Sequence, residues 1–177
     1  MQINKENLTI IIVTLKSDKV IHKCLKSIDP QIKKIVVENS SNEQFIKNLQ
    51  KKYDNLKCYL TGQNLGMGTG NNFGIKKAKT NFVMILNPDT ILNFDTLDKI
   101  FHISKNLDYA IISPINSDKN YPNYKKRDKF TQKLFNSDLL EVDQVDGFAM
   151  ILNKSKFKET FFDEKIFMYL ENDDLCY

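Results

Sequence analysis

Acidic side chains at the ends of apolar stretches are the residues of this sequence best suited to chemistry. Six of them stand beside predicted strands or close together near the C-terminus: Glu38, Asp89, Asp146, Glu171, Asp173 and Asp174. A divalent cation that binds together with a diphosphate needs only one or two carboxylates, because water supplies its other ligands. Each carboxylate taken singly is typical of a helix cap or a solvated surface, so their recurrence at strand ends is what indicates a site.

Asp89 has the clearest context of the six. The run Phe82–Leu86 is apolar throughout, which is typical of a central strand covered on both faces. Pro88 cannot donate a hydrogen bond to a sheet and biases Asn87 towards an extended conformation. Asp89 is therefore expected just beyond the carboxyl end of a strand, where ligands bind in open α/β sheets. The alternative is that Asn-Pro-Asp-Thr is only a turn followed by a helix cap.

A glycine- and asparagine-rich loop is expected at Gly62–Gly74. The dinucleotide and P-loop interpretations both fail, because Gly66-x-Gly68 has no glycine at position 71, no Gly-Lys-Ser/Thr is present, and the loop follows the third predicted strand. What remains is a flexible backbone whose N–H groups and side-chain amides can approach a sugar or a phosphate. His22 and His102 lie on predicted helices without metal ligands at suitable spacing, and no Ser-His-Asp or Cys-His arrangement can be assembled.

Composition narrows the class of protein further. With 177 residues, of which 41% are hydrophobic, the chain is long enough for one domain with a real core and short for two. Its net charge of +4 comes from lysine, Arg127 is the only arginine, and no basic run alternates with aromatic residues, so nucleic acid is not an expected partner. The positive charge mildly favours an anionic ligand or membrane surface. We expect the three cysteines to be reduced thiols. No apolar run is long enough to span a bilayer and the N-terminus is polar, which predicts a soluble, cytoplasmic protein.

Alternating strands and helices must position these residues. Strands are predicted at Leu8–Leu15, Lys33–Glu38, Leu56–Thr61 and from Phe82 onwards, with helices between them. Ser17 is the expected N-cap of the first helix, and Ser41–Gln44 fits a capping box that opens the second. Right-handed crossovers then give the strand order 3-2-1-4, an α/β doubly wound sheet in which Thr14 and Asp89 face one cleft.

The second half of the chain is less regular. Asp95 can cap a helix through about Ser104, and strands are predicted at Tyr109–Ser113 and Val145–Leu152. Pro114–Lys129 has no period and contains two prolines and a basic cluster. It is expected to be a long, partly mobile loop over the cleft that becomes ordered when a donor binds.

Four motifs in the same order resemble those of family-two glycosyltransferases. They are Asn64-Leu-Gly66 through Gly70-Asn-Asn-Phe-Gly74, Leu86-Asn-Pro-Asp89, Asp146-Gly-Phe-Ala-Met150, and Phe162-Asp-Glu with Phe167-Met-Tyr-Leu-Glu171. The similarity covers nearly the whole chain and is greatest to the rhamnosyltransferase-like branch. It implies a GT-A fold, which is a Rossmann-like, doubly wound, mostly parallel sheet with helices on both faces.

The resemblance also implies an activity and a set of site residues. The activity is that of an inverting hexosyltransferase, which moves a sugar from a UDP- or dTDP-sugar to a saccharide or lipid-linked acceptor in cell-surface polysaccharide biosynthesis, with peripheral association at the inner membrane surface. Asp89 is the implied ligand of Mg²⁺ or Mn²⁺, in a degenerate Asp-x-Asp motif. The implied donor-binding residues are Thr14, Glu38, Asn64, Gly66, Asn71, Asn87 and Gly147. Glu171 or Asp174 is the implied base.

The sequence departs from the family pattern in ways that bear on activity. Leu15 and Lys16 replace a common Tyr-Asn pair, Glu38 replaces an aspartate, and Asn172 replaces the aspartate of a Glu-Asp pair that usually supplies the base. Relatives also continue beyond the position of Tyr177. We therefore expect one domain over 1–177, with a nucleotide-sugar-binding half at 1–90 and an acceptor-side half at 91–177 that is truncated.

Two alternatives to an active transferase remain open. A non-catalytic nucleotide-sugar-binding domain, or a truncated remnant, is consistent with Asn172 and the early stop. A Rossmann-type oxidoreductase is the other alternative, and the absence from this sequence of the glycine fingerprint in the first loop argues against it. The departures predict that the chain binds a donor better than it turns it over.

Overall fold

A six-stranded mixed sheet forms the centre of the computed structural model, which describes residues 1–105, 107–125, 134–136, 139–158 and 161–176. The strand order is β3-β2-β1-β4-β10-β5. Its strands are β1 (Leu8–Thr14), β2 (Lys33–Glu38), β3 (Leu56–Leu60), β4 (Phe82–Leu86), β5 (Ile111–Ile112) and β10 (Ala149–Asn153). The first four in chain order pair in parallel, and β10 runs antiparallel to both β4 and β5. The predicted order 3-2-1-4 is confirmed.

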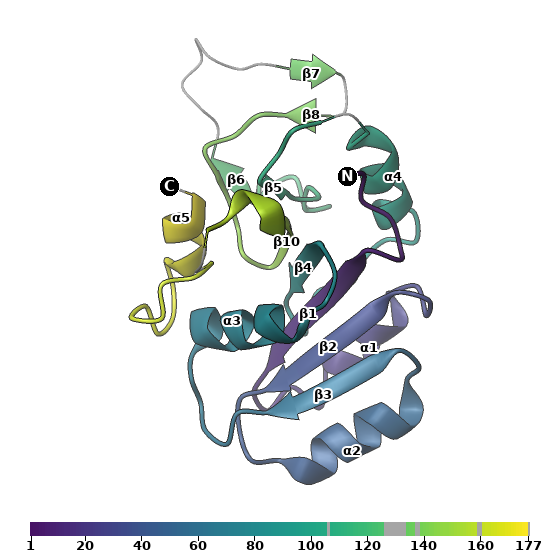
Figure 1. Cartoon of the computed structure of the whole chain (residues 1–177), viewed down its shortest axis with the longest axis vertical. Coiled ribbons are helices and arrows are strands. Elements are labelled where there is room, and N and C mark those ends of the chain that lie inside the picture. The colour runs from purple at the N-terminus through teal and green to yellow at the C-terminus, as the bar shows by residue number, and fades with distance from the viewer. Residues whose placement is uncertain (106, 126–133, 137–138, 159–160, 177) are drawn as a thin grey trace.

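Helices cover both faces of this sheet, as predicted (Figure 1). The helices are α1 (Ile21–Lys26), α2 (Glu43–Lys52), α3 (Met67–Lys77), α4 (Thr96–Ile103) and α5 (Glu171–Cys176). Side chains of α1, α2 and α4 share one apolar cluster with alternate strand residues such as Ile10, Ile12 and Met84. Side chains of α3 share the other cluster with Ile11 and Val83.

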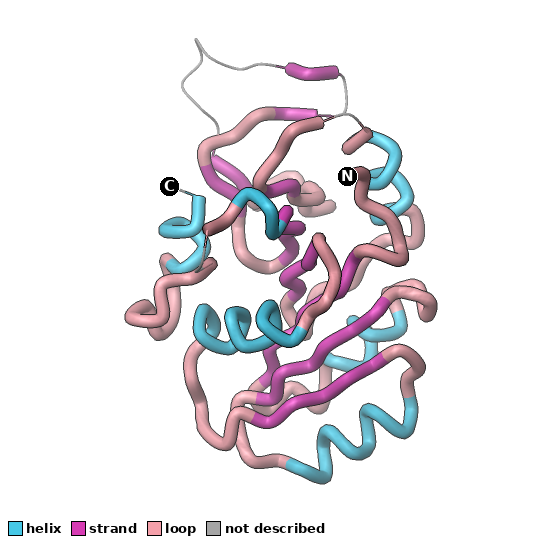
Figure 2. The backbone as a smooth tube through the Cα atoms, viewed as in Figure 1, coloured by secondary structure: helices cyan, strands magenta, loops and turns pink. Residues whose placement is uncertain are grey.

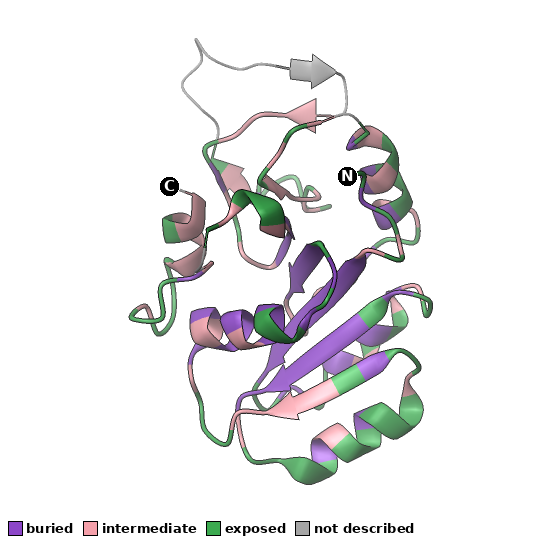
Figure 3. Ribbon diagram, viewed as in Figure 1, coloured by how far each residue is buried: buried purple, intermediate pink, exposed green. Residues whose placement is uncertain are grey.

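The central strands carry continuous apolar runs because both of their faces are covered. Every residue of β1 and β4 is buried, whereas most of β3 at the sheet edge is intermediate or exposed (Figure 3). Burial on two faces removes the polar alternation that a half-exposed strand would show. This is why the first four strands are legible in the sequence.

Helix N-termini differ from the prediction at two places. Ser17 does not cap α1 with its side chain; its backbone carbonyl accepts from the N–H of Val20 and of Ile21, at 3.1 and 3.0 Å. At α2 the cap is Asn42, whose side chain accepts from the Phe45 N–H at 3.1 Å. Ser41 instead donates its hydroxyl to the carbonyl of Gly62, so the predicted capping box is wrong. Several polar residues precede each helix, and local sequence alone does not select among them.

The glycine-rich segment is the largest correction in the first half. The sequence predicts a loop over Gly62–Gly74, but α3 begins at Met67, directly after Gly66. Glycine is a poor helix former, so propensity favours a loop. Tertiary packing decides otherwise, because a Cβ on Gly74 would lie 2.4 Å from a methyl carbon of Ile11. The absence of a side chain is what lets α3 lie close on the sheet.

The second half contains more short strands than predicted. Val145–Leu152 is divided into β9 (Gln144–Val145) and β10, and Tyr109–Ser113 is reduced to β5. The division follows from hydrogen bonds of the intervening turn, where the Asp146 N–H donates to the Asn123 carbonyl at 2.9 Å. Two further pairs are β6 (Tyr124–Lys125) with β9, and β7 (Leu134–Asn136) with β8 (Leu139–Leu140); a short 3₁₀ helix, η1 (Lys154–Lys156), follows β10.

The predicted mobile loop and the helix at Asp95 have mixed outcomes. The expected loop at Pro114–Lys129 lies partly outside the described residues, and its described part contains β6, which pairs with β9. The predicted helix is present as α4, which begins at Thr96; Asp95 occupies the N-cap position but makes no capping bond with its side chain. The mobility of Pro114–Lys129 and the ordering of this segment by a donor stay predictions.

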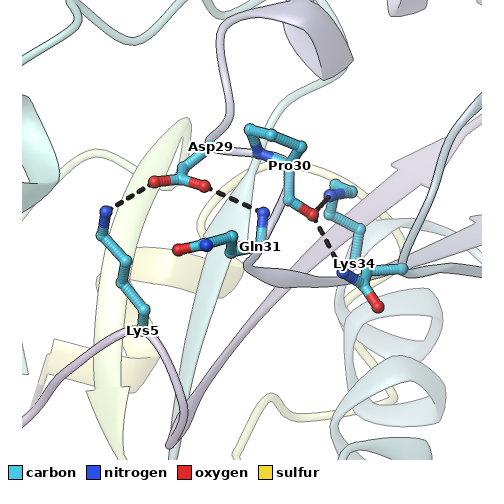
Figure 4. A network of polar contacts seen from close by, with 6 residues as sticks. Lys5, Asp29, Pro30, Gln31 and Lys34 are labelled. Atoms are coloured by element: carbon cyan, nitrogen blue, oxygen red, sulfur yellow. Dashed lines mark hydrogen bonds and ion pairs between the residues drawn. The ribbon is translucent and has the colours of Figure 1, made fainter.

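A polar network ties the chain before β1 to the loop before β2 (Figure 4). Lys5 Nζ donates to Asp29 Oδ2 at 2.6 Å, and Asp29 Oδ1 accepts from the Gln31 N–H at 2.8 Å. The hydrogen bond from Lys5 lowers the pKa of Asp29. Lys34 is buried and donates to the carbonyls of Pro30 and Ile32, while burial lowers the pKa of its ammonium group.

Within the described ranges, no helix has both the length and the apolar character that crossing a bilayer requires. All three cysteines carry free thiols.

Candidate functional site

Two of the predicted donor-binding residues meet at the carboxyl ends of β1 and β2. Thr14 and Glu38 are paired across the strands and are only 1% and 2% exposed. Thr14 Oγ1 donates to Glu38 Oε2 at 2.7 Å, and Ser40 Oγ donates to Oε1 at 2.5 Å. Both oxygens of the buried carboxyl group therefore accept hydrogen bonds, which fixes its orientation at the sheet edge.

The Thr14–Glu38 bond predicts a measurable cost for losing the hydroxyl. Thr14→Val keeps the shape of the side chain but leaves Glu38 Oε2 without this donor. We expect the free energy of unfolding to fall by about 2–3 kcal/mol, because leaving a buried carboxylate oxygen unsatisfied costs more than losing an average hydrogen bond. Urea denaturation measures this change.

A matched control lies on the same strand. Thr9 is also buried, and its hydroxyl accepts from the hydroxyl of Thr80 at 2.7 Å, a bond between neutral groups. Thr9→Val should cost only about 1 kcal/mol. Equal losses for the two valine variants would show that the Glu38 carboxyl group does not depend on Thr14.

Asn39 organises the start of α3 and was not identified from the sequence. Its side chain is buried, and Nδ2 donates to the Gly66 carbonyl at 2.8 Å and to Asn64 Oδ1 at 3.4 Å. Asn64 Oδ1 also accepts from the Gly66 N–H at 3.0 Å. The two predicted donor-loop residues Asn64 and Gly66 are thus fastened to the end of β2. The available signal was that Asn39 directly follows Glu38 at a strand end.

Two buried amide oxygens near this loop have no hydrogen-bond partner. They are Oδ1 of Asn39 and Oδ1 of Asn71, the latter on α3. An unsatisfied buried acceptor costs about 1–3 kcal/mol, so such an atom needs a donor from a ligand or a water. The pair of unpaired oxygens marks this region as incomplete without a polar partner.

The turn after β4 presents Asp89. The Asn87 N–H donates to the carbonyl of Phe148 at 2.8 Å, and the Asn87 carbonyl accepts from Cys24 Sγ at 3.5 Å. Asp89 itself is exposed. Burial, with a smaller contribution from the Asp89 charge, raises the pKa of the Cys24 thiol to about 12, so the thiol stays protonated and can donate. The backbone of Asn87 is thus fixed by Phe148 and Cys24, while the exposed carboxylate of Asp89 is accessible to a ligand.

A divalent cation can be accommodated at Asp89 only with help from a ligand. Among the residues that the structure describes, no three His, Cys, Asp or Glu side chains form a cluster that could hold a metal. One exposed carboxylate is nevertheless a suitable protein contribution for Mg²⁺ or Mn²⁺, since Mg²⁺ is commonly held by one or two carboxylates plus substrate phosphates and water. The residues therefore fit a cation that arrives with a diphosphate.

The C-terminal acidic residues lie beside α3 and β9. A Cβ on Gly68 would lie 3.6 Å from Glu171 Cβ, and one on Gly147 would lie 3.2 Å from Asn172 Cβ. Glu171 Oε2 is buried without a hydrogen-bond partner, whereas Asp174 is exposed. Of the two predicted bases, only Glu171 has a carboxylate oxygen that is buried by the surrounding protein.

Asn172 has a local structural role. Its Nδ2 donates to the Val145 carbonyl at 3.3 Å and to Asp173 Oδ1 at 3.0 Å. Asp173 in turn lies 3.6 Å from the ammonium group of Lys125. The structure therefore brings Gly147 together with the start of α5.

Most of the predicted site residues fall into three groups in the structure: Thr14 with Glu38, Asn64 with Gly66, and Asn87 with Asp89. Their functions stay predictions.

This arrangement suits ligand binding and proton transfer. It offers carboxylates at two strand ends, backbone and amide groups around α3, and a half-buried glutamate at α5 whose Oε2 is buried. Such groups can bind a polar, phosphorylated ligand and accept a proton.

Comparison with known proteins gives one family and several similar structures. The model of the family described as Glycosyl transferase family 2 matches residues 9–170. The low-salt glycan biosynthesis hexosyltransferase Agl10 of Haloferax volcanii is 29% identical over 191 residues, covering 97% of this chain and 61% of that protein. The chain therefore spans less than two thirds of that relative.

Two solved structures illustrate the likeness of fold. S. aureus TarS 1-349 in complex with UDP is 19% identical, with a TM-score of 0.70 over 96% of this chain and 54% of that one. The mannosyltransferase PcManGT from Pyrobaculum calidifontis, in complex with GDP-Man and Mn²⁺, is 12% identical, with a TM-score of 0.62 over 84% of this chain and 45% of that one. At these identities the likeness concerns the fold alone.

Proposed function

The chain belongs to glycosyl transferase family 2, and from this premise we propose that it binds a nucleotide-sugar at the carboxyl edge of β1, β2 and β4 and transfers the sugar to a glycan acceptor. Its fold is GT-A, a mostly parallel α/β sheet like that of TarS. The observation that carries the proposal is the convergence on one sheet edge of a fixed carboxyl group at Glu38 and an exposed one at Asp89, beside two unpaired amide oxygens.

Donor binding is assigned to the edge residues. Thr14 and Glu38 would contact the nucleoside, and Asn64, Gly66 and Asn71 would contact the rest of the donor. Asn87 and Asp89 would bind at the diphosphate, where Asp89 holds Mg²⁺ or Mn²⁺. When bound, the cation would neutralise charge on the leaving diphosphate. The UDP and the GDP-Man with Mn²⁺ in the two neighbouring structures support a nucleotide-sugar and a divalent cation as the class of ligand.

Transfer would proceed with inversion at the anomeric carbon. The acceptor hydroxyl oxygen forms a bond to that carbon as the bond to the diphosphate oxygen breaks, and the bonding pair leaves with the nucleoside diphosphate. Glu171 takes the hydroxyl proton, with Asp174 as the alternative base. The buried, unpaired Oε2 of Glu171 supports this preference, because it is an acceptor without a donor.

The finer identity of the reaction is also a proposal. The donor is a UDP- or dTDP-sugar, and the acceptor is a saccharide or a lipid-linked saccharide of a cell-surface polysaccharide, in keeping with the glycan-biosynthesis relative. Residues 1–90 would form the donor half and residues 91–177 the acceptor side. The protein would act in the cytoplasm with peripheral membrane contact, for which co-sedimentation with anionic vesicles is the test; equal recovery in the supernatant with and without vesicles would end that part of the proposal.

A non-catalytic nucleotide-sugar-binding role is the second candidate. It is favoured by Asn172, which replaces the usual carboxylate and is occupied by its bond to the Val145 carbonyl. An amide cannot accept the proton of an attacking hydroxyl as a carboxylate does. The two roles differ in turnover, since only a transferase releases UDP from a UDP-sugar.

Thermal unfolding with a panel of nucleotides tests the proposed function. The panel contains UDP, UDP-GlcNAc, a dTDP-sugar, GDP-Man and NADH, each with Mn²⁺ and with EDTA. Ligand at a hundredfold excess over its dissociation constant stabilises the native state by about 2.7 kcal/mol, which raises the melting temperature of a chain of this size by roughly 5–10 °C. We expect this shift for one class of nucleotide-sugar and only with Mn²⁺.

The panel also separates the alternatives. A shift with NADH alone would indicate the oxidoreductase class and end the proposal. Donor binding without release of nucleoside diphosphate, in assays with saccharide acceptors, would favour the non-catalytic role.

A further inference from the structure

The segment Phe161–Leu170, here called the strap, joins the second half of the chain to α5. It lies beside the N-terminal end of α3 (Figure 2). Its last four residues are 54, 44, 77 and 66% exposed although all are apolar or aromatic. Burial of these side chains therefore does not hold the end of the strap in place, and polar contacts must contribute.

Asn72 on α3 supplies the most complete of these contacts. The side chain is 3% exposed, and both ends of its amide bind the backbone of Phe162. Nδ2 donates to the Phe162 carbonyl at 2.8 Å, and Oδ1 accepts from the Phe162 N–H at 3.0 Å. Nδ2 also donates to Glu164 Oε1 at 3.1 Å. The amide of Asn72 thus pairs with the strap as a neighbouring strand would.

A second contact lies five residues further along the strap. The Met67 N–H, at the first position of α3, donates to the Phe167 carbonyl at 3.2 Å. Phe162 itself is buried against the cluster on the α3 face of the sheet. The strap is therefore attached to α3 at two points, one near each end.

These attachments determine where α5 begins. Tyr169 and Leu170 have φ angles of 66° and 69°, a left-handed conformation that costs roughly 1–2 kcal/mol for each such residue. Successive residues keep such a conformation only where the surrounding contacts enforce it. Glu171 follows directly, and its Cβ lies close to Gly68, the residue of α3 one turn before Asn72.

We propose that Asn72 is a positioning residue: by fixing the strap on α3 it sets the place of the Glu171 carboxylate, without contacting the donor itself. The catalytic part of this inference rests on the proposed function, in which Glu171 is the base. Among the proposed donor residues, Thr14, Glu38 and Asp89 lie on other elements, and Asn71 on α3 is the exception. The inference therefore predicts a larger effect on turnover than on donor affinity.

Asn72→Asp is the informative substitution, because it replaces only the NH₂ group of the side chain by an oxygen. The carboxylate can still accept from the Phe162 N–H, but it loses the donor to the Phe162 carbonyl and faces the Glu164 carboxylate. We expect backbone amide hydrogen exchange in residues 161–176 to become at least tenfold faster, while exchange in β1, β2 and β4 is unchanged. Asn72→Ala, which loses both bonds, should accelerate it further.

Binding and turnover supply the readout that a purely structural role would not move. The affinity for UDP with Mn²⁺ should stay within about twofold. The kcat for release of UDP from a UDP-sugar should fall on the order of tenfold to a hundredfold at constant KM, because misplacing a catalytic group by about 1 Å can cost that much. Asn48→Asp, an exposed position on α2, is the matched control and should change neither quantity.

A second substitution should restore the function lost in Asn72→Asp, and two results would contradict the inference. Glu164→Gln in the Asn72→Asp background removes the repulsion and offers a donor, so strap protection and kcat should partly recover. Unchanged exchange in the strap, or parallel loss of UDP affinity and kcat, would overturn the inference. If the wild-type chain binds none of the nucleotides and nucleotide-sugars of the thermal panel and releases no nucleoside diphosphate from any of them, the proposed function fails. The exchange of residues 161–176 in Asn72→Asp still decides whether Asn72 positions the strap and Glu171.

Discussion

Replacing Asp89 with alanine is expected to abolish the cation-dependent binding of UDP and to leave the fold unchanged. The side chain is exposed at the turn after β4, so its loss should change the free energy of unfolding by only about 0.5 kcal/mol or less. Its proposed interaction with a cation is far larger. At 4 Å and an effective dielectric constant of about 20, two unit charges attract by about 4 kcal/mol, or roughly a thousandfold in affinity.

Titration calorimetry with UDP, in Mn²⁺ and in EDTA, measures this effect. Wild-type protein should bind UDP much more tightly in Mn²⁺, and Asp89→Ala should bind it equally weakly in both. Asp54→Ala removes another exposed carboxylate, in the turn between α2 and β3, and is expected to behave as wild type. If Asp89→Ala kept the wild-type response to Mn²⁺, Asn87–Thr90 would be only a turn, since the next helix begins at Thr96.

Gly66→Ala should be the most damaging substitution of a single hydrogen by a methyl group in the donor loop. Gly66 has a φ angle of 81°, and a Cβ built on it would lie 2.1 Å from the Phe167 carbonyl oxygen. That oxygen accepts from the Met67 N–H, so it cannot move without breaking the attachment of the strap. We expect a loss of about 3–5 kcal/mol of stability, of which about 1–2 comes from the left-handed conformation and the rest from overpacking.

Gly62→Ala is a close control for this prediction. Gly62 has a φ angle of 80°, but a Cβ there would meet nothing within 4 Å. The control should therefore show only the conformational cost of about 1–2 kcal/mol. Urea denaturation of both variants isolates the contact with Phe167 as their difference. Equal destabilisation would mean that the strap does not press on Gly66 in solution.

Gly66→Ala should also weaken UDP binding, because the Gly66 carbonyl accepts from Asn39 at the end of β2. Gly62→Ala should leave UDP affinity within about twofold of wild type. Displacement of Gly66 would release the amide of Asn39, whose unpaired Oδ1 lies beside the proposed donor site. Measuring affinity well below the melting temperature of each variant keeps this effect separate from global unfolding.

Local sequence was sufficient for the order of the first four strands, because the features that identify those strands lie in consecutive residues. Buried runs such as Leu8–Thr14 and Phe82–Leu86 are apolar on both faces, and the segments between them are short enough to make right-handed crossovers. From these features alone the order of the first four strands followed. The position of Asp89 after Pro88 was predicted in the same way.

The second half was harder to predict because its strands are short and paired over long separations. The strands β6 and β9 have two residues each, too few to show a periodic pattern, and β10 pairs with β4, more than 60 residues earlier in the chain. Alternation of apolar and polar residues is recognisable only over about four to eight residues. Here the partner strand, not the local sequence, decides the structure.

The sequence by itself determined the strand order and the positions of Thr14, Glu38 and Asp89 at or just after the carboxyl ends of β1, β2 and β4. That a ligand binds there stays a prediction. Only the tertiary structure decided that the glycine-rich segment is a helix, that Asn39 fastens its start, and that Asn72 pairs with Phe162, which is 90 residues away. The physical reason is the range of the interactions. Apolar strand segments and the residues that end them can be recognised from consecutive residues. Close approach at glycine and the hydrogen bonds of buried amides form only after distant segments have packed together.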